Sequence, residues 1–127
     1  MKPCKRGHLY YANLDPTVGS EQAGYRPVLI IQNNTGNRHS PTVIVASVTS
    51  QGKLKANLPT HCYINRIGSC KQPSVVMLEQ IRTIDKSRLE NYIGKVNKDT
   101  MRKIDQALAV SVGLTDIYST EKEESYV

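Results

Sequence analysis

Five short apolar runs, separated by turn signals, constrain the fold of this chain more than any other feature of the sequence. Each run is bounded by glycine, proline, asparagine or aspartate, and several are rich in β-branched residues. Runs of this length and composition are typical of β-strands. The expected strands are His8–Asn13 and residues 27–32, 42–49, 60–64 and 75–84.

The connections and the C-terminal segment are predicted from turn and capping residues. Residues 33–37 read Asn-Asn-Thr-Gly-Asn, and we expect a turn there and another at residues 85–89. Asn97 is a suitable N-cap for a helix in which apolar residues recur at three-to-four spacing, and Gly113 would end it. The helix is the last expected element.

Short strands followed by one helix predict a mainly β protein with a C-terminal α-helix. We expect a small, strongly bent antiparallel sheet or partly open barrel, with the helix over an open end or an edge. The 127 residues, 39% of them hydrophobic, suffice for one modest core. We therefore expect one domain over residues 1–115, followed by a tail over residues 116–127.

The charge of the chain predicts a polyanionic partner. The formal net charge is +6, but residues 116–127 carry a net −3, which leaves +9 on the remaining 115 residues. A merely solvated basic surface is the alternative. Membrane binding is disfavoured, because the chain has no run of about 18 apolar residues and no basic helix with a bulky apolar face.

The cysteines and the N-terminal residues favour a cytoplasmic protein. Cys4, Cys62 and Cys70 are odd in number and lack CxxC spacing, which suits a reducing compartment and makes a zinc site improbable. The first residues carry no apolar segment of the kind that a secretory signal needs. We expect no metal and no cofactor.

An anion-handling site is expected where a polar loop enters the second strand. Gly19 and Gly24 give the loop conformational freedom, and Pro27 biases Arg26 toward an extended conformation at the edge of the strand. The loop also carries Ser20, a carboxylate, an amide and an aromatic ring. A permanent cation thus lies beside several groups that can bind or exclude anions.

Five blocks of sequence in and around this loop have a distinctive order and spacing. The first block reads Lys-Arg-Gly-His-Leu-Tyr-Tyr-Ala-Asn-Leu-Asp-Pro, and the loop block Gly-Ser-Glu-Gln is followed by Arg-Pro-Val-Leu-Ile-Ile-Gln-Asn. The remaining blocks are Pro-Thr-Val-Ile-Val-Ala and Leu-Glu-Gln-Ile-Arg-Thr-Ile-Asp. These blocks resemble the MazF/PemK toxins of bacterial toxin-antitoxin modules, and the resemblance spans roughly residues 5–115.

The resemblance implies an SH3-like barrel with a C-terminal helix, usually a homodimer, that cuts single-stranded messenger RNA at short sequence motifs. It assigns catalysis to Arg26 and Thr49, with Glu21 as a further contributor. It also implies a cognate antitoxin whose C-terminal segment covers the RNA groove. The chain is individual at residues 50–58, at residues 62–72 and in the acidic tail, so the cleavage motif is the least transferable property.

Metal-independent RNA cleavage fits these residues chemically. When the 2′-OH of RNA attacks the adjacent phosphate, a doubly charged phosphorane forms, and the guanidinium of Arg26 can donate two hydrogen bonds to it. The Thr49 hydroxyl can donate another. Glu21 is a better proton carrier than an arginine, whose pKa exceeds about 12. Arg26 pairing with Glu79 or Asp85 on the surface is the structural alternative.

RNA binding is expected to draw on phosphate contacts, stacking and amide groups. Tyr25 is the best-placed stacking ring, since the chain has no Trp or Phe. One of the adjacent Tyr10 and Tyr11 should belong to the core, because they point to opposite faces of a strand. The expected RNA contacts are Ser20, Gln22, Tyr25, Asn33, Lys53, Lys55, Gln80, Arg82 and, for phosphates, Lys86. Each amide has an internal turn or backbone hydrogen bond as its alternative role.

Two other functions remain open. A non-catalytic RNA-binding module would bind RNA without cutting it, although Glu21, Arg26 and Thr49 together argue against this reading. A topoisomerase poison resembling the CcdB toxins would need a C-terminal tryptophan, and this chain has none. His8, His39 and His61 show no spacing that predicts a catalytic pair.

Overall fold

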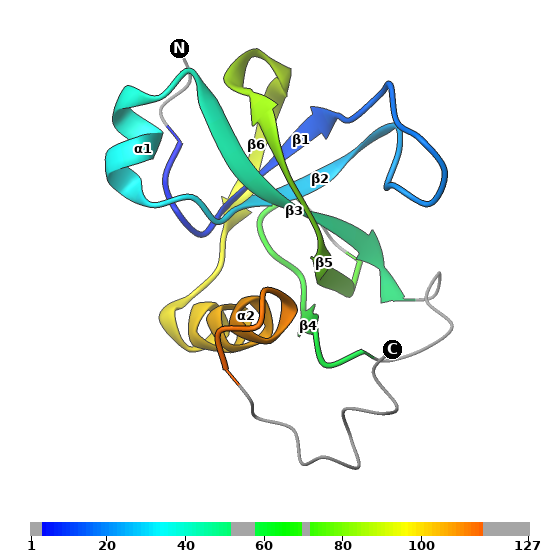
Figure 1. The fold of residues 1–127 in the computed structure, drawn as a ribbon, viewed down its shortest axis with the longest axis vertical. Helices are drawn as coiled ribbons and strands as arrows, with labels where there is room; N and C mark the ends of the chain where they lie inside the picture. Colours follow the sequence, from blue (N-terminus) through cyan, green and yellow to red (C-terminus); the bar gives the residue numbers. More distant parts are fainter. Residues whose placement is uncertain (1–3, 52–57, 70–71, 116–127) are drawn as a thin grey trace.

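The computed structural model describes residues 4–51, 58–69 and 72–115. They form a six-stranded antiparallel sheet in the order β4-β5-β3-β2-β1-β6, with two α-helices (Figure 1). In chain order the elements are β1 His8–Asn13, β2 Tyr25–Ile30, α1 Asn34–His39, β3 Thr42–Ser50, β4 His61–Ile64, β5 Ser74–Asp85, the 3₁₀ turn η2 Lys86–Arg88, β6 Leu89–Lys95 and α2 Lys98–Ser111.

All five strands predicted from the sequence are present. β1 has the expected bounds, and β3 and β5 differ from the prediction by no more than one residue at each end. β2 begins two residues earlier than expected, so Arg26 lies inside the strand, paired with Ala12 of β1. The expected turn at residues 85–89 contains η2, whose N-cap Asp85 accepts a hydrogen bond from Ser87 that lowers the pKa of the carboxyl.

Two elements correct the sequence-based prediction. Residues 33–37 form no simple turn: Asn33 is the N-cap of helix α1, and its side chain accepts a hydrogen bond from Gly36 N at 2.8 Å. β6 was not predicted, because its buried residues, Leu89 and Ile93, are four positions apart rather than alternating. Its pairing with β1 is interrupted by bulges, which break the two-residue period.

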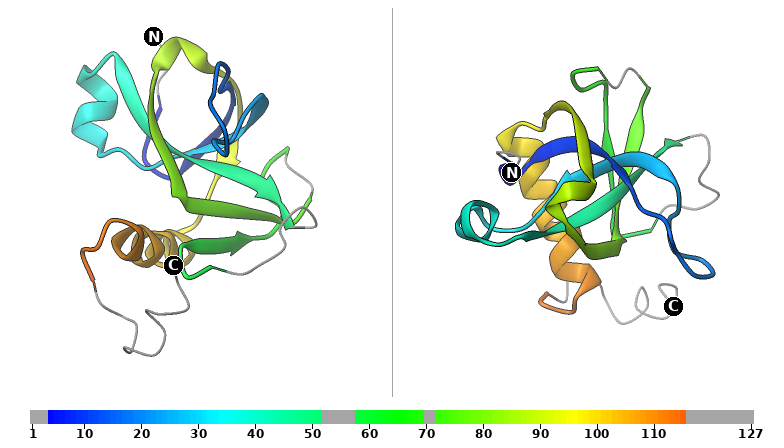
Figure 2. Two further views of the ribbon diagram at one scale, coloured as in Figure 1. Left: turned by 45° about the vertical axis from the view of Figure 1, so that its right-hand side comes forward. Right: turned by 90° about the horizontal axis from the view of Figure 1, so that it is seen from above.

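The sheet is strongly curled (Figure 2), and the buried residues of β1 and β2 are divided between two core clusters. Leu9 and Leu29 belong to a core cluster shared with α2, whereas Tyr10 and Val28 belong to a second cluster on the other face. This explains why the strands read as continuous apolar runs. Tyr10 is buried and Tyr11 is only half-buried, so the expectation that one of the two joins the core is confirmed.

Helix α2 covers one end of the curled sheet, against β4 and β5 (Figure 1). The predicted cap is confirmed, since Asn97 accepts a hydrogen bond from Thr100 N at 2.8 Å, and Gly113 follows the helix with a φ of +75°. Ile104 and Ala107 insert into the core. No helix in the described part of the chain is long and apolar enough to cross a membrane. The predicted acidic tail lies outside the described residues.

Candidate functional site

An open groove of about 470 Å³ lies where β2 begins and β3 ends. Side chains from β1, β2, β3 and the segment before β5 form its walls. The lining residues are Tyr11, Tyr25, Arg26, Pro27, Val48, Thr49, Ser50, Ser69, Gln72 and Ser74. The groove therefore brings together two of the three predicted catalytic residues, Arg26 and Thr49, with the predicted stacking residue Tyr25.

Arg26 is held by the loop that precedes it and by no carboxylate among the described residues. Its Nε donates a hydrogen bond to Ala23 O at 2.8 Å, and its Nη1 donates one to Gln22 Oε1. Pairing with Glu79 or Asp85 is therefore not what the structure contains. Nη2 has no hydrogen-bond partner within residues 4–51, 58–69 and 72–115. The guanidinium thus keeps donor capacity and an unneutralised charge at the groove.

Thr49 is the last residue but one of β3, and it lines the groove. Val28 of β2 pairs with Ser47 of β3, and continuing this antiparallel register by two residues leads to Arg26 and Thr49. The side chain of Thr49 is therefore on the same sheet face as that of Arg26. Thr49 is 9% exposed, so the residue as a whole is largely removed from solvent although it lines the groove.

Two tyrosine rings form one wall of the groove. The rings of Tyr11 and Tyr25 are stacked at a centroid distance of 5.2 Å and an interplanar angle of 8°. Tyr25 is 52% exposed, so its outer face is accessible. Tyr11 was missed as a site residue, although β-strand alternation places it opposite the buried Tyr10. Ser69 and Gln72 also line the groove, and no sequence signal pointed to them.

Glu21 lies in a second, smaller pocket rather than in the groove. This pocket, of about 170 Å³, is lined by Glu21, Gln22, Ser47, Gln80, Ile81 and Arg82. The Glu21 carboxylate accepts a hydrogen bond from Val18 N at 2.7 Å. Arg82 donates through Nη1 to Leu14 O at 2.9 Å. Both side chains therefore order the β1–β2 loop, and the structure does not bring Glu21 into the groove with Arg26 and Thr49.

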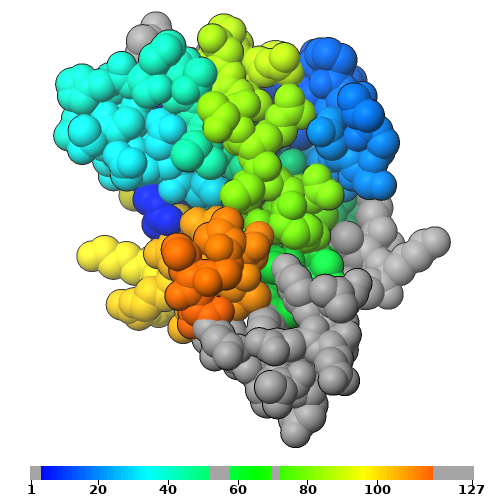
Figure 3. All heavy atoms as spheres, viewed as in Figure 1, coloured from blue at the N-terminus to red at the C-terminus, as the bar shows by residue number. Residues whose placement is uncertain are grey.

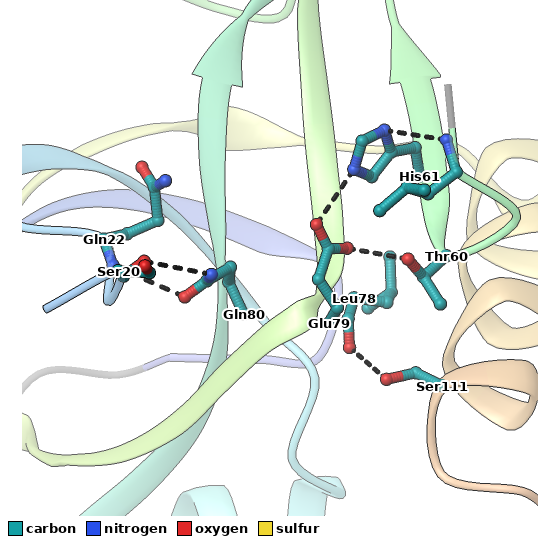
Figure 4. Close-up of polar contacts among 9 residues, drawn as sticks. Ser20, Gln22, Thr60, His61, Leu78, Glu79, Gln80 and Ser111 are labelled. Atoms are coloured by element: carbon teal, nitrogen blue, oxygen red, sulfur yellow. Dashed lines mark hydrogen bonds and ion pairs between the residues drawn. The ribbon is translucent and has the colours of Figure 1, made fainter. Parts of the chain in front are cut away.

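The remaining predicted RNA contacts are dispersed. Gln80 holds Ser20 and Gln22 of the loop (Figure 4). Asn33 caps α1 beyond the other end of β2 from Arg26. Lys53 and Lys55 lie outside the described residues.

Lys86 corrects the prediction of an exposed phosphate contact. It is buried, and its Nζ donates a hydrogen bond to Asn37 O. An internal carbonyl thus takes the place that was expected for a phosphate.

The histidines and cysteines occupy separate places in the fold. His8 begins β1, where burial and the nearby charges of Lys5 and Lys95 lower its pKa. His39 ends α1, and His61 contacts Glu79. Burial raises the pKa of the Cys4 and Cys62 thiols. Within the described ranges, no three His, Cys, Asp or Glu residues are grouped as metal ligands would be.

Residues 5–112 match a protein family described as PemK-like, MazF-like toxins of type II toxin-antitoxin systems. The chain is 54% identical to Endoribonuclease EndoA of Bacillus subtilis (strain 168) over 114 residues. The matched region covers 88% of this chain and 97% of the relative. A solved complex of a mycobacterial endoribonuclease with its cognate antitoxin superposes with a TM-score of 0.73 at 30% identity, over 89% of this chain and 98% of the other.

A crystal structure of MazF from Deinococcus radiodurans has the same fold, with a TM-score of 0.76 at 24% identity over 89% of this chain and 99% of the other. These likenesses agree with the predicted mainly β, SH3-like architecture with a C-terminal helix. The barrel is not closed, because the two edge strands of the described sheet, β4 and β6, are not paired with each other.

Proposed function

This chain belongs to the PemK-like, MazF-like family of type II toxins and is an endoribonuclease of that family, and we propose that it cuts single-stranded messenger RNA at specific short sequences without a metal ion. The observation that carries the proposal is the presence of Arg26, Thr49 and the exposed ring of Tyr25 in one groove. A cation, a hydroxyl donor and a stacking surface are what a protein needs to hold an RNA backbone in a reactive conformation.

In the proposed reaction the RNA supplies its own nucleophile. The 2′-oxygen bonds to the adjacent phosphorus and its proton leaves, while the bond from phosphorus to the 5′-oxygen breaks and that oxygen takes up a proton. The products are a 2′,3′-cyclic phosphate and a 5′-hydroxyl. Arg26 stabilises the charge that develops on the phosphorane, with the Thr49 hydroxyl as a second donor.

The surrounding residues support RNA binding in different ways. Tyr25, backed by Tyr11, stacks on a base next to the cleaved phosphate. Arg82, which lines the second pocket, and Ser20 of the β1–β2 loop contribute RNA contacts, and Lys53 and Lys55 contribute contacts to phosphates. Asn33 would reach only RNA that extends past the opposite end of β2. Glu21 contributes through the order of the β1–β2 loop rather than by direct proton transfer.

The partners that we propose are inferred from membership of this family. The enzyme works in the cytoplasm as a homodimer, acts on single-stranded RNA and is neutralised by a cognate antitoxin. The solved mycobacterial relative in complex with its antitoxin supports that last assignment. The charge of Arg26 in the groove gives an antitoxin the same electrostatic target as RNA.

Thr49→Val tests the groove with a nearly isosteric change. We expect the rate of RNA cleavage to fall by about 100-fold, because one hydrogen bond to the developing charge is lost. Thr83→Val on the exposed side of β5 is the matched control and should cut at the native rate. Rates are measured with a labelled single-stranded RNA under single-turnover conditions. A native rate for Thr49→Val would remove Thr49 from the mechanism.

A further inference from the structure

Strand β5 contains a three-residue bulge next to the candidate site. Ala46 of β3 pairs with Ile81, whereas the next residue, Ser47, pairs with Met77. Residues 78–80 therefore stand between two consecutive pairs of the ladder. Such bulges bend a strand and redirect its side chains, and they are common beside active sites.

Two residues of the bulge are anchored on the side of α2 and β4. Leu78 receives a hydrogen bond on its carbonyl from Ser111 Oγ at 2.6 Å. The carboxylate of Glu79 accepts hydrogen bonds from Thr60 Oγ1 at 2.7 Å and from His61 Nε2 at 2.9 Å. Figure 4 shows these contacts, which fix the bulge from one side.

The third residue of the bulge, Gln80, points the opposite way, toward the β1–β2 loop (Figure 4). Its Nε2 donates to Ser20 O and its Oε1 accepts from Gln22 N, each at 3.4 Å. The space-filling view shows the loop in blue directly beside β5 in light green (Figure 3). Both polar atoms of the Gln80 amide are thus used to hold the loop backbone.

The loop in turn holds the guanidinium of Arg26. Gln22, whose backbone N–H is held by Gln80, accepts a hydrogen bond from Arg26 Nη1 on its side-chain oxygen. The carbonyl of the next residue, Ala23, accepts from Arg26 Nε. A continuous set of hydrogen bonds therefore leads from the bulge through Gln22 to Arg26.

We propose that Gln80 is a positioning residue for Arg26, acting through Gln22, and that the β5 bulge exists to place it. The proposal rests on the function proposed above. An arginine at the rim of an open groove has several rotatable bonds, and its alignment with a phosphate is lost unless its neighbours fix it. Gln22 and Gln80 thus act on the rate of cutting rather than on base recognition.

Gln80→Leu removes both loop contacts and leaves an apolar side chain that is one atom shorter. We expect kcat to fall by about tenfold or more with KM changed less than about twofold, because the loss is one of alignment and not of RNA contact. Gln106→Leu, at an exposed position on α2, is the matched control and should retain native values. Gln22→Met, which keeps the backbone but lacks the amide oxygen, should reproduce the fall in kcat.

A double-mutant cycle separates positioning from RNA contact. In an Arg26→Lys background, where the guanidinium contacts to Gln22 and Ala23 are already gone, adding Gln80→Leu should change the single-turnover rate by less than about twofold. A full additional tenfold loss, or a raised KM with native kcat, would overturn the positioning role. If the unmutated protein binds RNA without cutting it, the proposed function fails instead, so the two failures are distinguishable. Circular dichroism identifies a misfolded Gln80→Leu, in which case the Gln22→Met cycle decides.

Discussion

Arg26→Ala is expected to reduce RNA cleavage by at least about 1,000-fold while leaving the protein folded. The loss is large because the groove has no second cation among its described lining residues to take over the charge of the phosphorane. Folding should persist, since Arg26 is only half-buried and, among the described residues, its side chain donates hydrogen bonds only to the adjacent loop. A change in unfolding free energy within about 0.5 kcal/mol is expected for such a position.

The assay compares single-turnover cleavage by Arg26→Ala, Arg26→Lys and Arg38→Ala. Arg38 is exposed on α1, beyond the other end of β2, so its removal should leave the rate native. Lysine keeps the charge but lacks the two parallel N–H donors of a guanidinium. The cleavage rate of Arg26→Lys should therefore lie between the rates of the other two variants. Substantial cutting by a folded Arg26→Ala would show that the groove is not the site of cleavage.

Gly68→Ala is expected to destabilise the folded protein more than the addition of a methyl group at any other described glycine. A Cβ at Gly68 would lie 1.7 Å from Ile93 O. The Cβ position is fixed by the backbone of residue 68 and the oxygen is a backbone atom, so neither can rotate away. Gly68 also has a φ of +54°, which costs an L-residue about 1–2 kcal/mol. We expect destabilisation by about 3 kcal/mol or more, measured by urea unfolding.

Gly19→Ala is the matched control for the cost of placing an alanine at a positive φ. Gly19 has a similar φ of +57°, but apart from its chain neighbours no atom of the described residues lies within 4 Å of its added Cβ. The free energy of unfolding should therefore fall by only about 1–2 kcal/mol in Gly19→Ala. The excess loss in Gly68→Ala measures the close approach between the segment before β5 and β6. Equal losses in the two variants would mean that this approach does not exist in solution.

The sequence predicted the elements whose residues carry a local signal. β3 and β5 are long, β-branched and apolar, and the N-cap of α2 is an asparagine followed by a regular apolar spacing. β6 lacked such a signal, because its pairing with β1 is irregular and most of its residues are exposed. Helix α1 was missed because its six residues contain turn formers, and its stability depends on contacts with Gln32 and Lys86.

Part of the candidate site could likewise be predicted from the sequence, and part depends on the folded sheet. Arg26 before a proline-led strand, and Thr49 at the end of another, could be found from the sequence and the family resemblance. The meeting of these residues with Ser69 and Gln72 depends on the curl of the sheet, which no local pattern encodes. Gln80 was predicted as an RNA contact, but its use as a loop anchor depends on a bulge that appears only in the strand register.

End-group analysis of RNA cut in the presence of EDTA tests the central claim most directly. Purified protein is incubated with a mixed single-stranded RNA, and the 5′ ends of the products are mapped by sequencing. The proposed mechanism predicts cutting at one short sequence, with 5′-hydroxyl and 2′,3′-cyclic phosphate ends, that is lost in Arg26→Ala. Binding without scission, cutting that stops when EDTA is added, or products with 5′-phosphate ends would contradict it.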